Sequence, residues 1–189
     1  MAVDLPKVHQ QALDHTARYV AGVKEAQWDA PTPDEEWDVR TLVNHVVSGN
    51  FWVSPLVEGK TIEQVGDRYD GDVLGEDPSA AYQQSAKEAA AAFNGEGAMQ
   101  ALCAVSYGPV PGEIYAGHRF IDVLIHGWDL AKATGQDTTL PADLVEAAFE
   151  VVEPQKDLLA ASGMFGSDVK VPEGADRQTL LLAELGRTA

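Results

Sequence analysis

Two side chains that commonly bind metal ions lie four residues apart in a strongly apolar segment. Asp122 and His126 are separated by Val, Leu and Ile, and more large apolar residues flank the pair. In an α-helix, residues at this spacing project from the same face, about one turn apart. A carboxylate oxygen and an imidazole nitrogen both bind zinc or a similar first-row ion at about 2.0–2.2 Å. The pair is therefore a candidate half of a metal site.

The same pair also has a purely structural interpretation, because an acid and a histidine at this spacing often form an ordinary pair on a helix surface. The apolar neighbourhood indicates burial, and a buried acid and imidazole without partners cost several kcal/mol. A metal ion or a buried polar network would satisfy them. The spacing on its own favours the structural interpretation, and both alternatives stay open at this point.

A third candidate ligand is His45, in the apolar string Thr-Leu-Val-Asn-His-Val-Val-Ser. A lone histidine on an apolar helix is more often a core residue than a ligand. With Asp122 and His126, however, it would complete a set of two histidines and one carboxylate that leaves positions open for water or substrate. Metal coordination by these three residues is the central hypothesis from the sequence.

The remaining polar residues of this kind are given lesser roles. His118 lies eight residues before His126, so helical rotation turns it about 80° away from a shared centre. Asp129 lies three residues after His126. We expect His118 and Asp129 to contact the ligands or line the rim, with catalytic residues unassigned. His9 and His15 have no predicted role.

Helical periodicity predicts the elements that must carry these residues. Asp38 is a good N-cap, Pro55 is expected to end or bend the helix that contains His45, and Gly135 is a suitable C-terminal cap. The expected helices span Leu5 to Ala26, Asp38 to Val53, Pro78 to Phe93, Pro111 to Gly135, Pro141 to Ala161 and Asp176 to Leu185.

Two connecting segments carry weaker signals. Gly59 to Pro78 holds four glycines and many acids, which predicts a loop with one short helical turn near Ile62. Met99 to Tyr107 has some alternation of apolar residues but is short, and we predict an extended loop there. Asn50, Trp52 and the loop from Asp67 to Leu74 could line the entrance of the site, with ordinary surface or core packing as the alternative, which we favour for Trp52.

Composition limits the class of protein. A chain of 189 residues with 45% hydrophobic and 23% charged residues is expected to fold as one domain. Its formal net charge of −17 disfavours nucleic acid and anionic lipid as partners. A single cysteine, Cys103, excludes an intrachain disulfide and a thiolate-rich zinc site. With no signal peptide or membrane span in the sequence, we expect a cytoplasmic protein.

Two strings resemble a known family. They are Asp-Val-Leu-Ile-His-Gly-Trp-Asp-Leu-Ala-Lys-Ala-Thr-Gly-Gln from Asp122 to Gln136, and Trp-Asp-Val-Arg-Thr-Leu-Val-Asn-His from Trp37 to His45. The chain resembles the actinobacterial metal-binding branch of the DinB/YfiT-like superfamily, which is related to the N-terminal domain of mycothiol-dependent maleylpyruvate isomerase. The resemblance extends over nearly the whole chain, including the closing Gly-Met-Phe-Gly and Leu-Gly-Arg strings.

The resemblance implies an all-α four-helix bundle of the up-down-down-up type, with additional short C-terminal helices. Residues 1–189 would form a single metal-binding domain, with the bundle over 4–161, an extension over 162–189, and no counterpart of the isomerase's separate C-terminal domain. By motif position it implies a metal held by His45, Asp122 and His126. Many relatives have a histidine, and the isomerase a glutamate, where this chain has Asp122. The ion would be zinc or nickel.

Three functional hypotheses follow. The first is a metal-dependent enzyme that acts with a low-molecular-weight thiol such as mycothiol, as an S-transferase or isomerase, on an electrophilic small molecule. The second is a hydrolase that uses metal-bound water, with Asp129 handling protons. The third is a non-catalytic, metal-stabilised binding module. Bundles of this kind often pair, so we also expect a homodimer.

Overall fold

The structure is a computed structural model that describes residues 3–34, 36–155, 169–171 and 173–189. The described part is mostly helical with one small two-stranded sheet. It divides into two compact units, of which the larger is Asp4–Asp137 and the smaller contains Thr138–Ala189. A single domain over the whole chain stays a prediction. The Gly-Met-Phe-Gly string and the end of the helix predicted to reach Ala161 lie outside the described residues.

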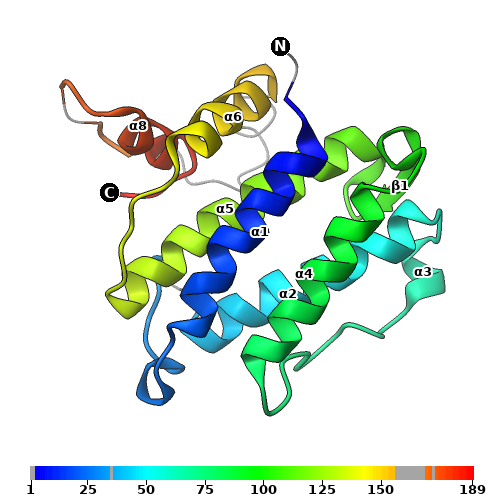
Figure 1. Cartoon of the computed structure of the whole chain (residues 1–189), viewed down its shortest axis with the longest axis horizontal. Coiled ribbons are helices and arrows are strands. Elements are labelled where there is room, and N and C mark those ends of the chain that lie inside the picture. Colours follow the sequence, from blue (N-terminus) through cyan, green and yellow to red (C-terminus); the bar gives the residue numbers. More distant parts are fainter. Residues whose placement is uncertain (1–2, 35, 156–168, 172) are drawn as a thin grey trace. The chain divides into compact units, whose positions relative to one another are not determined.

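Four long helices make up most of the larger unit. α1 packs on α4 and α5, and α2 packs on the same two helices, as can be followed in Figure 1. Short helical segments occupy three of the connections. The long helices are α1 (Leu5–Ala21), α2 (Val39–Val57), α4 (Pro78–Phe93) and α5 (Gly112–Thr134), and the short ones are η1 (Glu25–Gln27), α3 (Ile62–Val65) and η2 (Ala98–Gln100).

Local capping explains where these helices begin. The side chain of Asp38 accepts a hydrogen bond from the backbone N–H of Thr41, which satisfies one of the free donors at the start of α2. This confirms the predicted cap. The α2 helix does not end at Pro55, however, but continues to Val57. Pro55 therefore lies within the last turn of α2, and the helix ends two residues after it.

The segment from Met99 to Tyr107, predicted as an extended loop, instead contains the end of η2 and the first strand of a β-hairpin, and that prediction was wrong. Strands β1 (Leu102–Val105) and β2 (Gly108–Pro111) are antiparallel, with Leu102 opposite Pro111. Four-residue strands are too short to be recognised from alternation alone, because their stability comes from pairing with each other and packing on the helices. β2 runs directly into α5, whose N-cap is Pro111 and whose C-cap is the left-handed Gly135.

Helix α5 is buried along most of its length, as its apolar sequence predicted. It lies so close to α1 that Gly127 leaves no room for a side chain: an added Cβ would overlap Oγ1 of Thr16 and lie 3.2 Å from its Cβ. The Thr16 hydroxyl also donates a 3.1 Å hydrogen bond to the carbonyl oxygen of Val123. Close contact with α1 thus fixes the part of α5 that carries the candidate ligands.

We expect Gly127→Ala to lower the free energy of unfolding by about 1–3 kcal/mol, because the new methyl group overpacks this contact. Alanine is otherwise better than glycine in a helix interior by about 1 kcal/mol. Urea unfolding of Gly127→Ala in the wild-type and Thr16→Ala backgrounds separates the two effects. If the loss is as large without the Thr16 hydroxyl, the close contact is not its cause.

The smaller unit contains α6 (Ala142–Val152), η3 (Glu153–Gln155) and α8 (Arg177–Glu184). α6 packs on α8, and Arg177 makes a bidentate ion pair with Glu146 at 2.8 Å. The predicted last helix is confirmed, with Asp176 as its N-cap. Among the described residues, no helix combines the length and apolar character needed to cross a membrane.

Candidate metal centre

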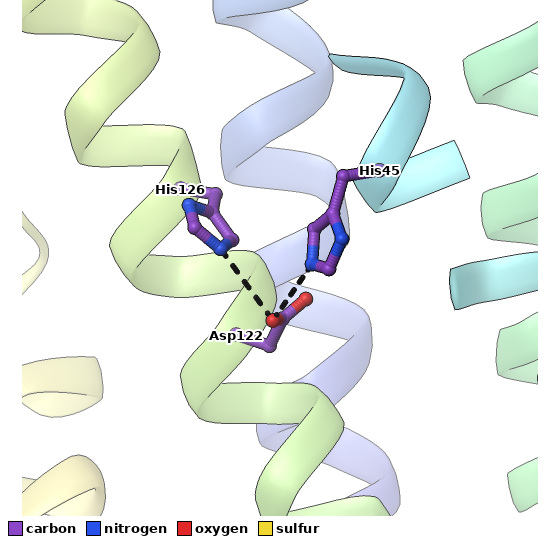
Figure 2. Close-up of side chains that lie close together, drawn as sticks. All are labelled: His45, Asp122 and His126. Carbon is purple, nitrogen blue, oxygen red and sulfur yellow. Dashed lines mark hydrogen bonds and ion pairs between the residues drawn. The ribbon is translucent and has the colours of Figure 1, made fainter. Parts of the chain in front are cut away.

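The three predicted ligands come together where α2 faces α5. Figure 2 shows His45, from α2, pointing at Asp122 and His126, which lie one turn apart on α5. Nε2 of His45 is 3.2 Å from Oδ1 of Asp122, and Nε2 of His126 is 3.5 Å from the same oxygen. Each residue offers one ligand atom, and the three atoms lie within 4.8 Å of one another.

This geometry fits a small divalent ion. Ligand atoms bound at about 2.1 Å in tetrahedral geometry lie about 3.4 Å from each other, close to the two separations from Asp122 Oδ1 of 3.2 and 3.5 Å. The donor types, two imidazole nitrogens and one carboxylate oxygen, suit zinc and nickel. Both imidazoles present Nε2 to the same oxygen of Asp122, so the three ligand atoms face a common point at which an ion could bind.

Asp129, which the sequence predicted to contact the ligands or line the rim, lies beside Nδ1 of His126. It is fully buried, and its Oδ2 lies 3.1 Å from Nδ1 of His126. An imidazole that donates Nδ1–H to a carboxylate presents Nε2 as the free ligand atom, which is the usual arrangement around metal-bound histidines. Asp129 thus contacts a candidate ligand. The ligand cluster itself does not include it.

His118 takes a different position from Asp129. Its Nδ1 lies 2.5 Å from the hydroxyl of Tyr107, in the turn of the β-hairpin, and the two rings are 5.5 Å apart. It is not part of the ligand cluster found among the described residues. His118 and His126 lie eight residues apart on α5, and the role of His118 at the rim stays a prediction. His15 contacts Tyr19 and also lies outside the cluster.

Two residues outside the predicted set, Trp37 and Arg119, contact the candidate ligands. The ring of Trp37 lies 4.6 Å from that of His45 and 5.4 Å from that of His126, so it covers one side of the pair. Arg119 donates a 2.7 Å hydrogen bond to Oδ2 of Asp122. Signals for both were present: Trp37 directly precedes the N-cap of α2, and Arg119 is a charge in an apolar helix three residues before Asp122.

The segment predicted to line the entrance lies along α2. Asn44, next to His45, donates to the carbonyl oxygen of Gly71 and accepts from the N–H of Val73, both at 2.9 Å. Arg40, one turn earlier, pairs with Asp72 at 2.7 Å. These bonds hold the segment beside the His45 turn of the helix. Asn50, by contrast, is fully buried and does not face solvent.

Electrostatics keep the carboxylate of this cluster ionised. Burial by itself would raise the pKa of Asp122, but Arg119 and then His126 outweigh it and hold the pKa well below its usual value. Burial would likewise lower the pKa of His126, yet Asp122 and Asp129 raise it to about 9. In the metal-free protein the cluster is therefore an ion pair, and a divalent ion would have to replace the proton on His126.

Comparison with known proteins gives a match over most of the larger unit. The family model of the mycothiol maleylpyruvate isomerase N-terminal domain matches residues 9–131, which include all three clustered residues. The chain belongs to this family. The resemblance inferred from the two sequence strings is thereby confirmed. Its relatives include the uncharacterised proteins MT0763 and Rv0738 of Mycobacterium tuberculosis, each 36% identical over 188 residues, covering 95% of this chain and 96% of theirs.

Solved structures of a mycothiol-dependent maleylpyruvate isomerase share the fold of this family member. The crystal structure of that enzyme matches with a TM-score of 0.65 at 16% identity, and that of a mutant form matches with 0.67 at 17%. Each comparison covers 87% of this chain and 72% of the isomerase chain. At such low identity the likeness establishes the fold and leaves the chemistry to be argued from the site.

Proposed function

We propose that this protein is a divalent-metal-dependent enzyme that acts with a low-molecular-weight thiol of the mycothiol type, as an S-transferase or isomerase. The observation that carries the proposal is the convergence of His45, Asp122 and His126 at ligand-to-ligand distances. Membership of the mycothiol maleylpyruvate isomerase N-terminal domain family supports a thiol as the co-substrate. The relatives of solved structure are described as mycothiol-dependent, which agrees with this choice.

The side chains of the cluster differ in exposure in a way that suits such a role. The side chain of His126 is 9% exposed, whereas those of His45 and Asp122 are 38% and 26% exposed. The buried ligand anchors the centre, and the other two leave one side open to a small molecule. When bound there, a divalent ion of zinc or nickel type would lower the pKa of a coordinated thiol and supply a thiolate.

The chain's own residues have distinct tasks in this proposal. Asp129 holds the His126 ring through Nδ1, so that Nε2 stays available as a ligand. Trp37 shields the imidazoles of His45 and His126 from water on one side. Neither Asp129 nor Trp37 is required to touch the thiol. The electrophile, for which maleylpyruvate, halo-aromatics and epoxides are candidates, would approach from the exposed side of His45.

We further propose that α1, α2, α4 and α5 form the up-down-down-up four-helix bundle implied by the family. In Figure 1, α2 and α4 run in the same direction and α1 and α5 run in the opposite one. The long connection over residues 58–77, which includes α3, gives the chain the length to return between two parallel helices. In this arrangement α2 and α5 are antiparallel neighbours, which brings the turn of His45 to the turn of His126.

The proposed function is tested with protein purified without a histidine tag and loaded with zinc or nickel. We expect the metal-loaded protein to bind mycothiol in calorimetry, and S-methyl mycothiol at least about tenfold more weakly, because the blocked sulfur cannot become a thiolate. We also expect consumption of mycothiol in the presence of one of the electrophiles. Loaded protein that neither binds nor consumes mycothiol would refute the proposal, and ester or amide hydrolysis without any thiol would favour the hydrolase hypothesis instead.

A further inference from the structure

A buried cation lies directly behind the candidate ligands. Arg119 is only 7% exposed, and within the described part of the chain its guanidinium donates three hydrogen bonds. Nη1 donates to Oδ2 of Asp122 at 2.7 Å, and Nη2 donates to Oδ1 of Asn50 at 2.9 Å and to the carbonyl oxygen of Val46 at 3.3 Å. The guanidinium thus connects α2 to the carboxylate on α5.

The surrounding sequence is shaped to hold this side chain. An added Cβ at Gly49 of α2 would overlap Nη1 of Arg119 and lie 2.7 Å from its Cζ, so the guanidinium fills space that only glycine leaves free. Asn50 is fully buried and donates in turn to the hydroxyl of Ser85 on α4 at 3.2 Å. Because contacts from α2, α4 and α5 fix the guanidinium or its partner, its position relative to Asp122 is set by the fold.

The contact decides which oxygen of Asp122 is available. Arg119 occupies Oδ2, whereas Oδ1 faces His45 and His126 at 3.2 and 3.5 Å. We propose that Arg119 is a positioning residue of the metal centre: it aims one oxygen of Asp122 at the ion and offsets the negative charge of that carboxylate. This inference rests on the metal site of the proposed function.

The charges around the candidate site also affect which ligands a bound ion would attract. Two neutral imidazoles, the carboxylates of Asp122 and Asp129, and one guanidinium sum to −1, so a divalent ion would leave a net charge of +1 in these surroundings, and the same centre without the guanidinium would be neutral. Such a centre attracts an anionic fourth ligand, such as a thiolate, more strongly than one whose charge is reduced by an unpaired carboxylate. Arg119 thereby favours anionic small molecules at the open position without touching them.

The test uses the full chain loaded with cobalt, whose visible spectrum reports ligand geometry, and azide as a simple anionic probe. We expect Arg119→Met to alter the cobalt spectrum and to weaken azide binding about tenfold, because one positive charge near the ion is lost. Arg119→Lys should recover most of the azide affinity but not the spectrum, because lysine restores the charge without the fixed planar donors. Gly49→Ala keeps Arg119 but displaces it, and should change the spectrum in a protein that stays folded.

The outcomes separate this inference from the proposed function. Wild-type protein that binds no cobalt would refute the metal site itself. If the wild type loads cobalt but the spectrum and azide affinity are unchanged in Arg119→Met and Gly49→Ala, Arg119 has only a structural role and the inference fails. A variant that melts cooperatively but no longer loads cobalt supports the inference, because a purely structural arginine would leave the ligands of a folded protein in place. Should Arg119→Met not fold, the Gly49→Ala and Arg119→Lys spectra decide between the two.

Discussion

Replacement of His126 by alanine is expected to lower the affinity of the protein for zinc by at least about 100-fold. Loss of a residue that only supports a ligand typically costs about 10- to 100-fold, and loss of the ligand itself should cost more. His126 is the most buried of the three candidate ligands, and Asp129 fixes its orientation. Its removal therefore takes away the anchor of the centre and leaves Asp129 without the imidazole that it holds.

The measurement is competition with a chromophoric zinc chelator, combined with elemental analysis of untagged protein. His118→Ala is the matched control, because this histidine lies on the same helix two turns before His126, contacts Tyr107 and is not a member of the ligand cluster found among the described residues. It should bind zinc as the wild type does. His45→Ala should lose affinity as His126→Ala does. Equal metal content in the wild type and both ligand variants would mean that the three residues form a polar network without an ion.

Acid is expected to destabilise the metal-free protein through His9 as the pH falls below about 6.5. His9 on α1 is fully buried, and its ring lies 5.0 Å from that of Phe93. Neither ring nitrogen has a hydrogen-bond partner among the described residues. Burial, and then the nearby charge of Arg119, lowers the pKa of His9 to about 3, although Asp122 acts in the opposite direction.

The sign follows from proton binding. Between the unfolded pKa of 6.5 and the folded pKa of about 3, the unfolded chain takes up a proton on His9 and the folded chain does not. Stability therefore decreases as the pH falls through this window, at about 1.4 kcal/mol per pH unit, which amounts to on the order of 3 kcal/mol between pH 6.5 and 4. Urea unfolding in the presence of a chelator at several pH values measures the decrease.

His9→Leu is the informative variant. Leucine is similar in size and does not titrate, so the His9 contribution to the pH dependence should disappear. Stability at pH 7 should also rise by about 1–3 kcal/mol, because two buried polar atoms without partners are removed. Asp122 and His126 titrate in both proteins, and their contribution cancels in the difference. If the difference in unfolding free energy between the wild type and His9→Leu stays constant from pH 7 to pH 4, the pKa of His9 is the same in the folded and unfolded states. The prediction is then wrong.

Local sequence signals were sufficient where the determining interactions lie within one helix. Asp38 identified the start of α2, and Gly135 identified the end of α5. Local sequence signals were insufficient to predict the β-hairpin and the continuation of α2 past Pro55. A strand pair gains its stability from a partner segment, and a proline in the last turn of a helix can be accommodated when the rest of the helix is packed. Propensity alone does not contain either contribution.

For the candidate site, the sequence by itself determined that Asp122 and His126 share a helix face, because the pitch of an α-helix fixes the spacing of residues four apart. Arg119 and Asp129 each lie three residues from their partner on the same helix, so helix pitch also brings these pairs close together. Only the tertiary structure decided that His45 reaches Oδ1 of Asp122 and that Asn50 holds the guanidinium of Arg119, because both contacts depend on how α2 and α5 pack. That packing is set jointly by many side chains of both helices and by residues such as Gly49 that allow close approach, so no short string of sequence specifies it.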